Sequence, residues 1–96
     1  MAKQLTVRWT EQALDSFEDM ALQLIENWNY KIAQDFDNDV QELIERLENN
    51  AKLCPPSKVK KLRKCVFHKN ASLIYRVKSS TIELITFIDN RSNHHF

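Results

Sequence analysis

Along this chain the spacing of hydrophobic residues changes twice, from alternation to a helical period and back to alternation. Residues 4–9, QLTVRW, predict a short half-buried strand, one side of which is made of Leu5, Val7 and Trp9. Thr10 suits a helix N-cap, and Glu11 then lies in the first turn, where the helix dipole favours a carboxylate. A helix is predicted over 11–27, with an apolar stripe at Leu14, Phe17, Ala21, Leu24, Ile25 and Trp28.

The segment NWNY, residues 27–30, interrupts this stripe. We expect Asn27 or Asn29 to take the left-handed conformation that a turn between helices often needs. A second amphipathic helix follows and ends by the segment ENNA, with apolar residues at Ile32, Phe36, Val40, Leu43, Ile44 and Leu47. The short connection between the two helices predicts an antiparallel helical hairpin.

After the loop that contains Pro55 and Pro56, the period becomes that of strands. Three segments rich in β-branched and aromatic residues predict an antiparallel meander: 62–68, 72–77 and 81–89. If the first turn occupies residues 69–72, His68 faces Leu73, and a slip of one residue would change these partners. The chain has no glycine, so the tight turns use Asn70 and the Ser79-Ser80 pair, and glycine-dependent phosphate loops are excluded.

The order β-α-α-β-β-β predicts one α+β domain over residues 1–96, in which a helical hairpin covers one face of a mostly antiparallel sheet. We expect the N-terminal strand to pair within this sheet, and the opposite face is left to solvent or a partner. No apolar run approaches the roughly 18 residues of a membrane span, and the start MAKQLTVRW lacks a secretory signal. We therefore expect a cytoplasmic protein.

The net charge of +1 conceals a strong asymmetry between the two halves of the chain. Residues 1–51 carry four Lys/Arg against eleven Asp/Glu, a net charge of −7, and residues 52–96 carry ten against two, a net charge of +8. Such an asymmetry suggests an anionic partner for the second half.

Most of these cations fall on one predicted hairpin and the loop before it. The candidate nucleic-acid-binding residues are Lys58, Lys60, Lys61, Arg63, Lys64, Lys69 and Arg76, with Phe96 as a candidate for stacking on bases. Two other interpretations remain open: the cations keep an edge strand soluble, or they bind an acidic protein segment.

Candidate catalytic residues are His68 on the hairpin and three residues of the tail, Arg91, His94 and His95. Such groups suit metal-independent RNA cleavage, in which one group deprotonates a 2′-hydroxyl, cations stabilise the phosphorane-like charge, and another group protonates the leaving 5′-oxygen. A structural role for the histidine and a frayed C-terminus are the simpler alternatives.

Neither a cofactor nor a metal is expected. Cys54 and Cys65 are too few for a disulfide framework, and in the cytoplasm we expect both to be reduced and structural. Zinc ligands drawn from Cys65, His68, His94 and His95 would match no known finger or ribbon spacing.

The element order and two stretches of sequence resemble the RelE/ParE family of bacterial type II toxins. LRKCVFHKNASLIYRV resembles the family's basic strand and the Leu-Ile/Val-Tyr strand after it, and ELITFIDNRSNHHF resembles its last strand and arginine-containing tail. The resemblance covers nearly the whole chain. It implies a toxin, of the kind associated with plasmid stabilisation, that is neutralised by an antitoxin whose acidic, partly disordered segment wraps around it.

The resemblance also implies roles for individual residues. Arg91 falls where RelE-like nucleases place a phosphate-stabilising arginine, and Lys64 or His68 falls near their catalytic lysines or histidine. His94, His95 or Phe96 falls near a tail histidine or tyrosine. Ser72 departs from the arginine common at that position, so Arg76 or the lysines would have to meet the transition-state charge.

Members of this family differ in target, since RelE-like toxins cut mRNA in the ribosomal A site and ParE-like toxins poison DNA gyrase. We expect ribosome-dependent mRNA cleavage, because Arg91, His94 and His95 supply chemistry that gyrase inhibition does not need. The long acidic helical hairpin favours the alternative, a gyrase inhibitor that blocks replication. A non-catalytic binding module is the third interpretation.

Overall fold

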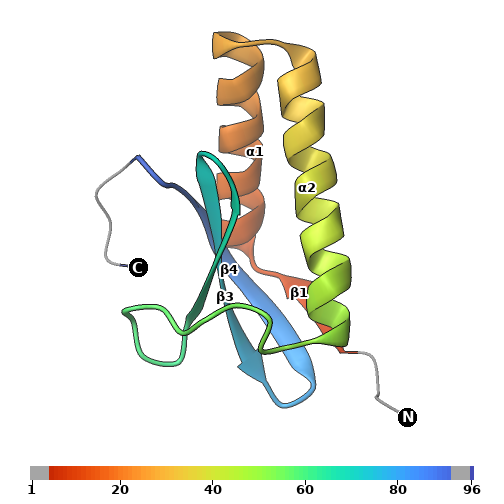
Figure 1. Ribbon diagram of the computed structural model, residues 1–96, viewed down its shortest axis with the longest axis vertical. Coiled ribbons are helices and arrows are strands. Elements are labelled where there is room, and N and C mark those ends of the chain that lie inside the picture. Colours follow the sequence, from red (N-terminus) through yellow and green to blue (C-terminus); the bar gives the residue numbers. More distant parts are fainter. Residues whose placement is uncertain (1–4, 92–95) are drawn as a thin grey trace.

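The helices and strands follow one another in the order that the sequence predicts. The computed structural model describes residues 5–91 and Phe96. Its elements are β1 (Thr6–Trp9), α1 (Glu11–Asn27), α2 (Tyr30–Asn49), β2 (Arg63–His68), β3 (Ala71–Lys78) and β4 (Thr81–Asp89). Figure 1 shows α1 and α2 as an antiparallel hairpin beside the twisted sheet. The expected two-layer α+β fold is confirmed.

Side-chain caps fix the start of each helix. The Thr10 hydroxyl accepts a hydrogen bond from the backbone N–H of Ala13 at 3.1 Å and donates to the carbonyl of Leu84 at 2.6 Å, so it also ties α1 to β4. Asn29 has an extended backbone, and its side chain accepts from the N–H of Ile32 at 3.0 Å. The expectation of a left-handed Asn27 or Asn29 is wrong, because the cap of α2 requires an extended residue.

The sheet has the order β1-β4-β3-β2, and β1 pairs with β4 in parallel at one edge while the other pairs are antiparallel. His68 pairs with Ala71, and Cys65 pairs with Leu73. The expected turn over 69–72 is therefore wrong. Two turn residues suffice, and an irregularity between Val66 and His68 takes up the extra residue of β2.

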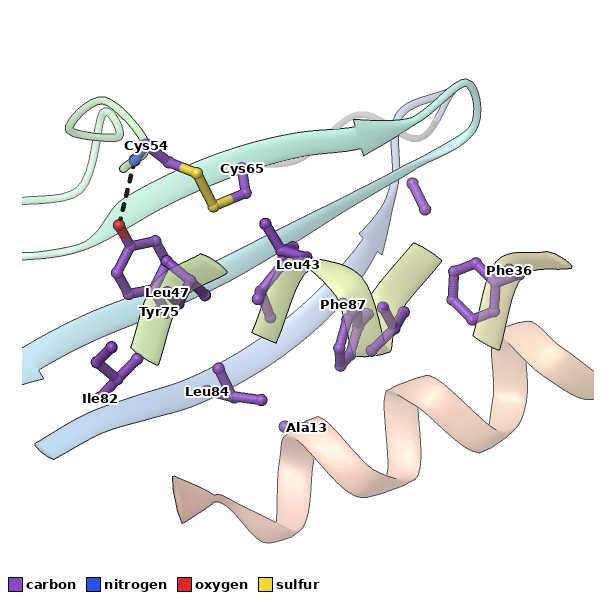
Figure 2. Close-up of a cluster of buried hydrophobic side chains, with 13 residues drawn as sticks. Ala13, Phe36, Leu43, Leu47, Cys54, Cys65, Tyr75, Ile82, Leu84 and Phe87 are labelled. Carbon is purple, nitrogen blue, oxygen red and sulfur yellow. Dashed lines mark hydrogen bonds between the residues drawn. A yellow bond between two sulfur atoms is a disulfide. The ribbon is translucent and has the colours of Figure 1, made fainter. Parts of the chain in front are cut away.

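The core lies between the sheet and the helices, and α2 supplies more of it than α1 does (Figure 2). The α2 stripe is as expected, with Phe36, Val40, Leu43 and Leu47 buried. Tyr75 of β3 is fully buried, and its hydroxyl donates to the carbonyl of Ala51 at 2.8 Å and accepts from the N–H of Cys54 at 3.4 Å. Burial raises the pKa of this phenol.

Helix α1 buries only part of the stripe that the sequence predicts. Ala13 is fully buried and Phe17, Met20 and Leu24 pack against the core, whereas the exposed fractions of Leu14, Ile25 and Trp28 are 45%, 40% and 66%. A helix of 17 residues is about 25 Å long, and in Figure 1 the far ends of both helices extend past the β2–β3 turn. Neither described helix is long and apolar enough to cross a membrane.

The expectation of two reduced cysteines is wrong, because Cys54 and Cys65 form a disulfide that links the proline-containing loop to β2 (Figure 2). Their Cα atoms are 5.2 Å apart, since Pro56 forms an isolated bridge with Arg63 and so folds the loop back along β2. The guanidinium of Arg63 also donates to the carbonyl of Cys54 at 2.6 Å. The loop is thus fastened at both ends.

Closing a loop of this length stabilises a folded protein by about 2–3 kcal/mol, because it restricts the unfolded chain. We expect a Cys54→Ala/Cys65→Ala variant to unfold roughly 10–20 °C below the wild type. Thermal unfolding followed by circular dichroism measures the shift. A thiol reductant should lower the melting temperature of the wild type and leave that of the double variant unchanged. Equal melting temperatures for the two proteins in oxidising buffer would contradict a stabilising disulfide.

Candidate functional site

An open groove with a volume of about 820 Å³ lies where β3 ends and the proline-containing loop begins. Cations from three segments line it: Lys52, Lys60, Lys61, Arg63, Arg76 and Lys78. Apolar side chains of Leu62 and Val77 also line this groove. We call it the basic groove, and its mixture of charge and apolar surface suits an acidic segment or a polyanion.

Backbone contacts hold the loop that carries these cations. The N–H of Ser57 donates to the carbonyl of Leu62 at 2.8 Å, and Lys61 takes a left-handed conformation with φ of 70° to make the turn. The N–H of Lys58 donates to the carbonyl of Phe96 at 3.5 Å, so the last residue of the tail returns to this loop. Lys58 is therefore beside the basic groove and does not line it.

A row of three charged side chains crosses the sheet on the face opposite the helices. Arg8 of β1 and Arg76 of β3 are both register partners of Glu83 of β4, whose neighbours Ile82 and Leu84 face the core. The shortest ion-pair distances to the carboxylate are 2.9 Å from Arg8 and 2.6 Å from Arg76. The hydrogen bond from Arg76, with help from Arg8, lowers the pKa of Glu83. The Arg76 guanidinium is thus already paired with a carboxylate of the same chain.

Two of the candidate catalytic residues meet at the other end of β3. His68 and Arg91 line one recess together with Asn70 and Asp89, and residues from the second half of α1 close it. The recess has a volume of about 30 Å³, far below the roughly 300–1,000 Å³ of typical ligand pockets. A nucleotide would not fit into it as the side chains stand.

Hydrogen bonding constrains the chemistry available to His68. Its Nδ1 accepts from the N–H of Asn70 at 3.2 Å, and its ring packs edge-on against Phe36 with centroids 5.9 Å apart. A neutral imidazole in this arrangement carries its proton on Nε2. It can donate a hydrogen bond to a phosphate oxygen, but it can act as a base only after giving up the backbone hydrogen bond.

Arg91 forms a two-pronged ion pair with Asp89. Its Nε and Nη2 atoms lie 3.1 and 2.9 Å from the two carboxylate oxygens, and its backbone N–H donates to one of them at 2.9 Å. The guanidinium hydrogen bond is the largest cause that lowers the pKa of Asp89 and raises that of Arg91. Binding a phosphate through Arg91 would require this pair to open or to share its charge.

The remaining candidates are dispersed. Lys64 lines a separate pocket of about 510 Å³ with Asp39, Glu42 and Arg46, and Lys69 is exposed in the β2–β3 turn. Ser72 is fully buried and donates to the side-chain oxygen of Asn90. His94 and His95 lie outside the described residues.

Six of the sequence-predicted residues therefore fall into two groups at opposite ends of β3. Arg63 and Arg76 join Lys60 and Lys61 in the basic groove, while His68 and Arg91 lie at the recess. The eight residues of β3 span roughly 23 Å. Within residues 5–91 and Phe96, the groove cations are thus too far from His68 and Arg91 to act on the same phosphate.

No set of three or more metal-ligating side chains gathers among the described residues. Cys65 is half of a disulfide, so its thiolate is not available to the zinc ligand set of Cys65, His68, His94 and His95, which the sequence did not favour.

Sequence reasoning missed several residues of these sites. Lys52 lies in the groove, Trp28 lines the recess, and Glu83 and Asp89 neutralise two of the candidate arginines. The spacing of Asp89 and Arg91 was a signal, because side chains two residues apart at a strand end can meet. Nothing in the local sequence around Glu83 predicts its two partners, Arg8 and Arg76, which are 75 and 7 positions away.

Comparison with known proteins points to one family. Residues 7–94 match the family described as the ParE toxin of type II toxin-antitoxin systems, parDE. No curated protein matches the sequence.

Several solved structures share the fold. A protein of the chromosomal ParDE system from P. aeruginosa is 19% identical with a TM-score of 0.80, and the match covers 92% of this chain and 98% of that one. A copper-bound mutant toxin from Helicobacter pylori is 20% identical with a TM-score of 0.65, covering 90% and 94%. A conserved hypothetical protein from Helicobacter pylori is 17% identical with a TM-score of 0.55 and the same coverage.

The Arg8–Glu83–Arg76 row makes stability depend on pH. Because the folded-state pKa of Glu83 is lowered, its contribution is complete above the ordinary carboxyl pKa of about 4.3 and is lost as the pH falls through the folded-state value. We expect Glu83→Gln to lower the urea midpoint at about pH 7, with a smaller difference from the wild type near pH 3. Glu45→Gln, at an exposed position of α2, is the control and should change the midpoint little. A Glu83→Gln deficit that is the same at both pH values would contradict this assignment.

Proposed function

The chain belongs to the ParE toxin family of type II toxin-antitoxin systems, and from that premise we propose that it arrests growth in the cytoplasm by binding and poisoning DNA gyrase. The observation that carries the proposal is that, within residues 5–91 and Phe96, the cations of the basic groove lie too far from His68 and Arg91 to act on the same phosphate. A toxin that acts by binding alone needs no assembled set of acid, base and phosphate-stabilising cations.

Three features support a binding mode of action over nucleolytic cleavage. Arg76 and Arg91 both have carboxylate partners within the molecule. The position where many nucleases of this kind have an arginine holds the buried Ser72. The recess beside His68, at about 30 Å³, is far smaller than a typical ligand pocket.

The cognate antitoxin is the partner we propose for the basic groove. Four lysines and Arg63 present positive charge there, and Leu62 and Val77 offer apolar contacts. An acidic, amphipathic segment matches both, and it would be drawn in by long-range attraction and then held by apolar burial. The basic groove therefore serves regulation in this proposal, and gyrase binding uses a different surface.

Purified protein should inhibit supercoiling of relaxed plasmid by DNA gyrase and should increase the amount of linear plasmid trapped by denaturation. The physical reason is that a bound toxin holds the enzyme at its DNA-cleaved stage. Gel electrophoresis of the plasmid measures both effects. Relaxation of the same plasmid by a type I topoisomerase is the control and should be unaffected. Full supercoiling activity at a large excess of the protein would refute the proposal.

Ribosome-dependent mRNA cleavage is the second candidate function, and one observation favours it. His68 and Arg91 line the same recess although they are 23 positions apart in sequence. Opening the Arg91–Asp89 pair would give a guanidinium beside an Nε2–H donor, which is a pair of groups that can hold a phosphate.

Under the gyrase proposal, mapping of transcript 5′ ends after induction should show no new cleavage sites during growth arrest. Under the second candidate, new 5′ ends appear within codons. They should then disappear in a His68→Ala/Arg91→Ala variant, because both groups that hold the phosphate are lost, and persist in Arg46→Ala, which removes an exposed cation of α2. New ends that depend on His68 and Arg91 would overturn the gyrase proposal in favour of the nuclease.

A further inference from the structure

The end of the helical hairpin exposes large apolar side chains. Leu22, Ile25, Trp28 and Tyr30 have exposed fractions of 55%, 40%, 66% and 71%. All residues from 25 to 31 are exposed, and in Figure 1 this part of the hairpin lies beyond the β2–β3 turn. We call residues 22–31 the hairpin tip.

The fold does not require apolar residues at the tip. The turn there is closed by the Asn29 cap and by a hydrogen bond from the N–H of Trp28 to the carbonyl of Leu24 at 3.0 Å, neither of which uses an apolar side chain. Leu24 packs against the core, whereas the four exposed apolar side chains of the tip are not part of it. Adjacent exposed aromatic and aliphatic side chains on a small protein are typical of a protein-protein contact, and Trp and Tyr are the residues most enriched in binding hot spots.

Carboxylates flank this apolar surface. Residues 18–37 carry five Asp/Glu and one Lys. Asp19 precedes Leu22 by three positions on α1 and Glu26 follows it by four, and both carboxylates are exposed, so they lie next to it on the helix surface. The tip therefore combines an apolar centre with a negative border, the opposite of the basic groove at the far end of the sheet.

We infer that the hairpin tip is the surface through which this protein holds its target, and that the target presents a cationic surface around an apolar recess, of the kind that otherwise binds the phosphates of DNA. Charge complementarity selects this partner, because a negative border is repelled by nucleic acid and by acidic proteins. The identity of the target as gyrase comes from the proposed function, and in that respect the inference rests on it. It predicts that the toxin competes with DNA for this surface only, while the DNA segment that gyrase cleaves stays bound elsewhere on the enzyme.

The apolar centre is tested by an Ile25→Ser/Tyr30→Ser variant, with Val66→Ser as the matched control because Val66 is 69% exposed on β2. None of these side chains is in the core, and circular dichroism checks that each variant folds. Removing contacts of hot-spot size should raise the concentration for half-inhibition of supercoiling roughly thirtyfold, whereas the control should match the wild type. An unchanged value for the tip variant would overturn the inference while leaving the gyrase proposal standing.

The negative border is tested by Asp19→Asn/Glu26→Gln, with Glu45→Gln as the control. Binding of wild-type toxin to gyrase should weaken as potassium chloride is raised and as linear DNA is added, and the double variant should show a shallower salt dependence than either the wild type or the control. Binding that ignores both salt and DNA would overturn the assignment of a DNA-binding surface.

Growth arrest separates this inference from the proposed function. If wild-type protein leaves gyrase untouched, the gyrase proposal falls, and the tip is then judged by whether Ile25→Ser/Tyr30→Ser still arrests growth on induction. If Ile25→Ser/Tyr30→Ser no longer arrests growth while Val66→Ser still does, the tip remains the target-binding surface. Retained arrest rejects the tip together with gyrase.

Discussion

Burial of Tyr75 is the interaction on which the arrangement of the rest depends. Its ring lies in the core between β3 and the end of α2, and its hydroxyl bonds the carbonyl of Ala51 and the N–H of Cys54. These bonds satisfy two backbone groups at the point where the chain leaves the helical layer, which would otherwise be costly to bury. The disulfide from Cys54 to Cys65 then directs the loop along β2. The position of the basic groove follows from this junction, because Lys60, Lys61 and Arg63 are carried by the segment it anchors.

Charge is separated in space much as it is along the sequence, with carboxylates over the helical hairpin and cations around the end of β3. The separation is incomplete on the open face of the sheet, where Glu83 binds both Arg8 and Arg76. Each end of the molecule consequently suits a different partner: a positive groove for an acidic segment and a negative, apolar tip for a cationic surface. A small domain can in this way present the proposed antitoxin-binding surface and the proposed target-binding surface at opposite ends, so that coupling between the two partners need not involve direct overlap.

Sequence reasoning succeeded where one local pattern decides the outcome. The α2 stripe, the Thr10 cap and the order of the elements along the chain all follow from periodicity and capping chemistry, which act over a few residues. It failed where distant segments decide. The register of His68 depends on an irregularity in β2, the fate of the cysteines depends on how the loop folds back, and the exposure of Ile25 and Trp28 depends on how far the sheet extends beneath α1. For the candidate site, the cationic residues could be named in advance, but their separation into a groove and a recess could not.

The amino-acid sequence by itself determined the element order, the opposite charges of the two halves and the family to which the chain belongs. These are properties of residue type and spacing, and they survive any rearrangement of the loops. Only the tertiary structure decided which cations remain available to a partner, because a carboxylate pairs with an arginine only when the fold brings the two within hydrogen-bonding distance. Glu83 pairs with Arg76 across neighbouring strands, and Asp89 pairs with Arg91 at a strand end. Electrostatic and hydrogen-bond energies fall steeply with separation, and separations in space are set by the fold.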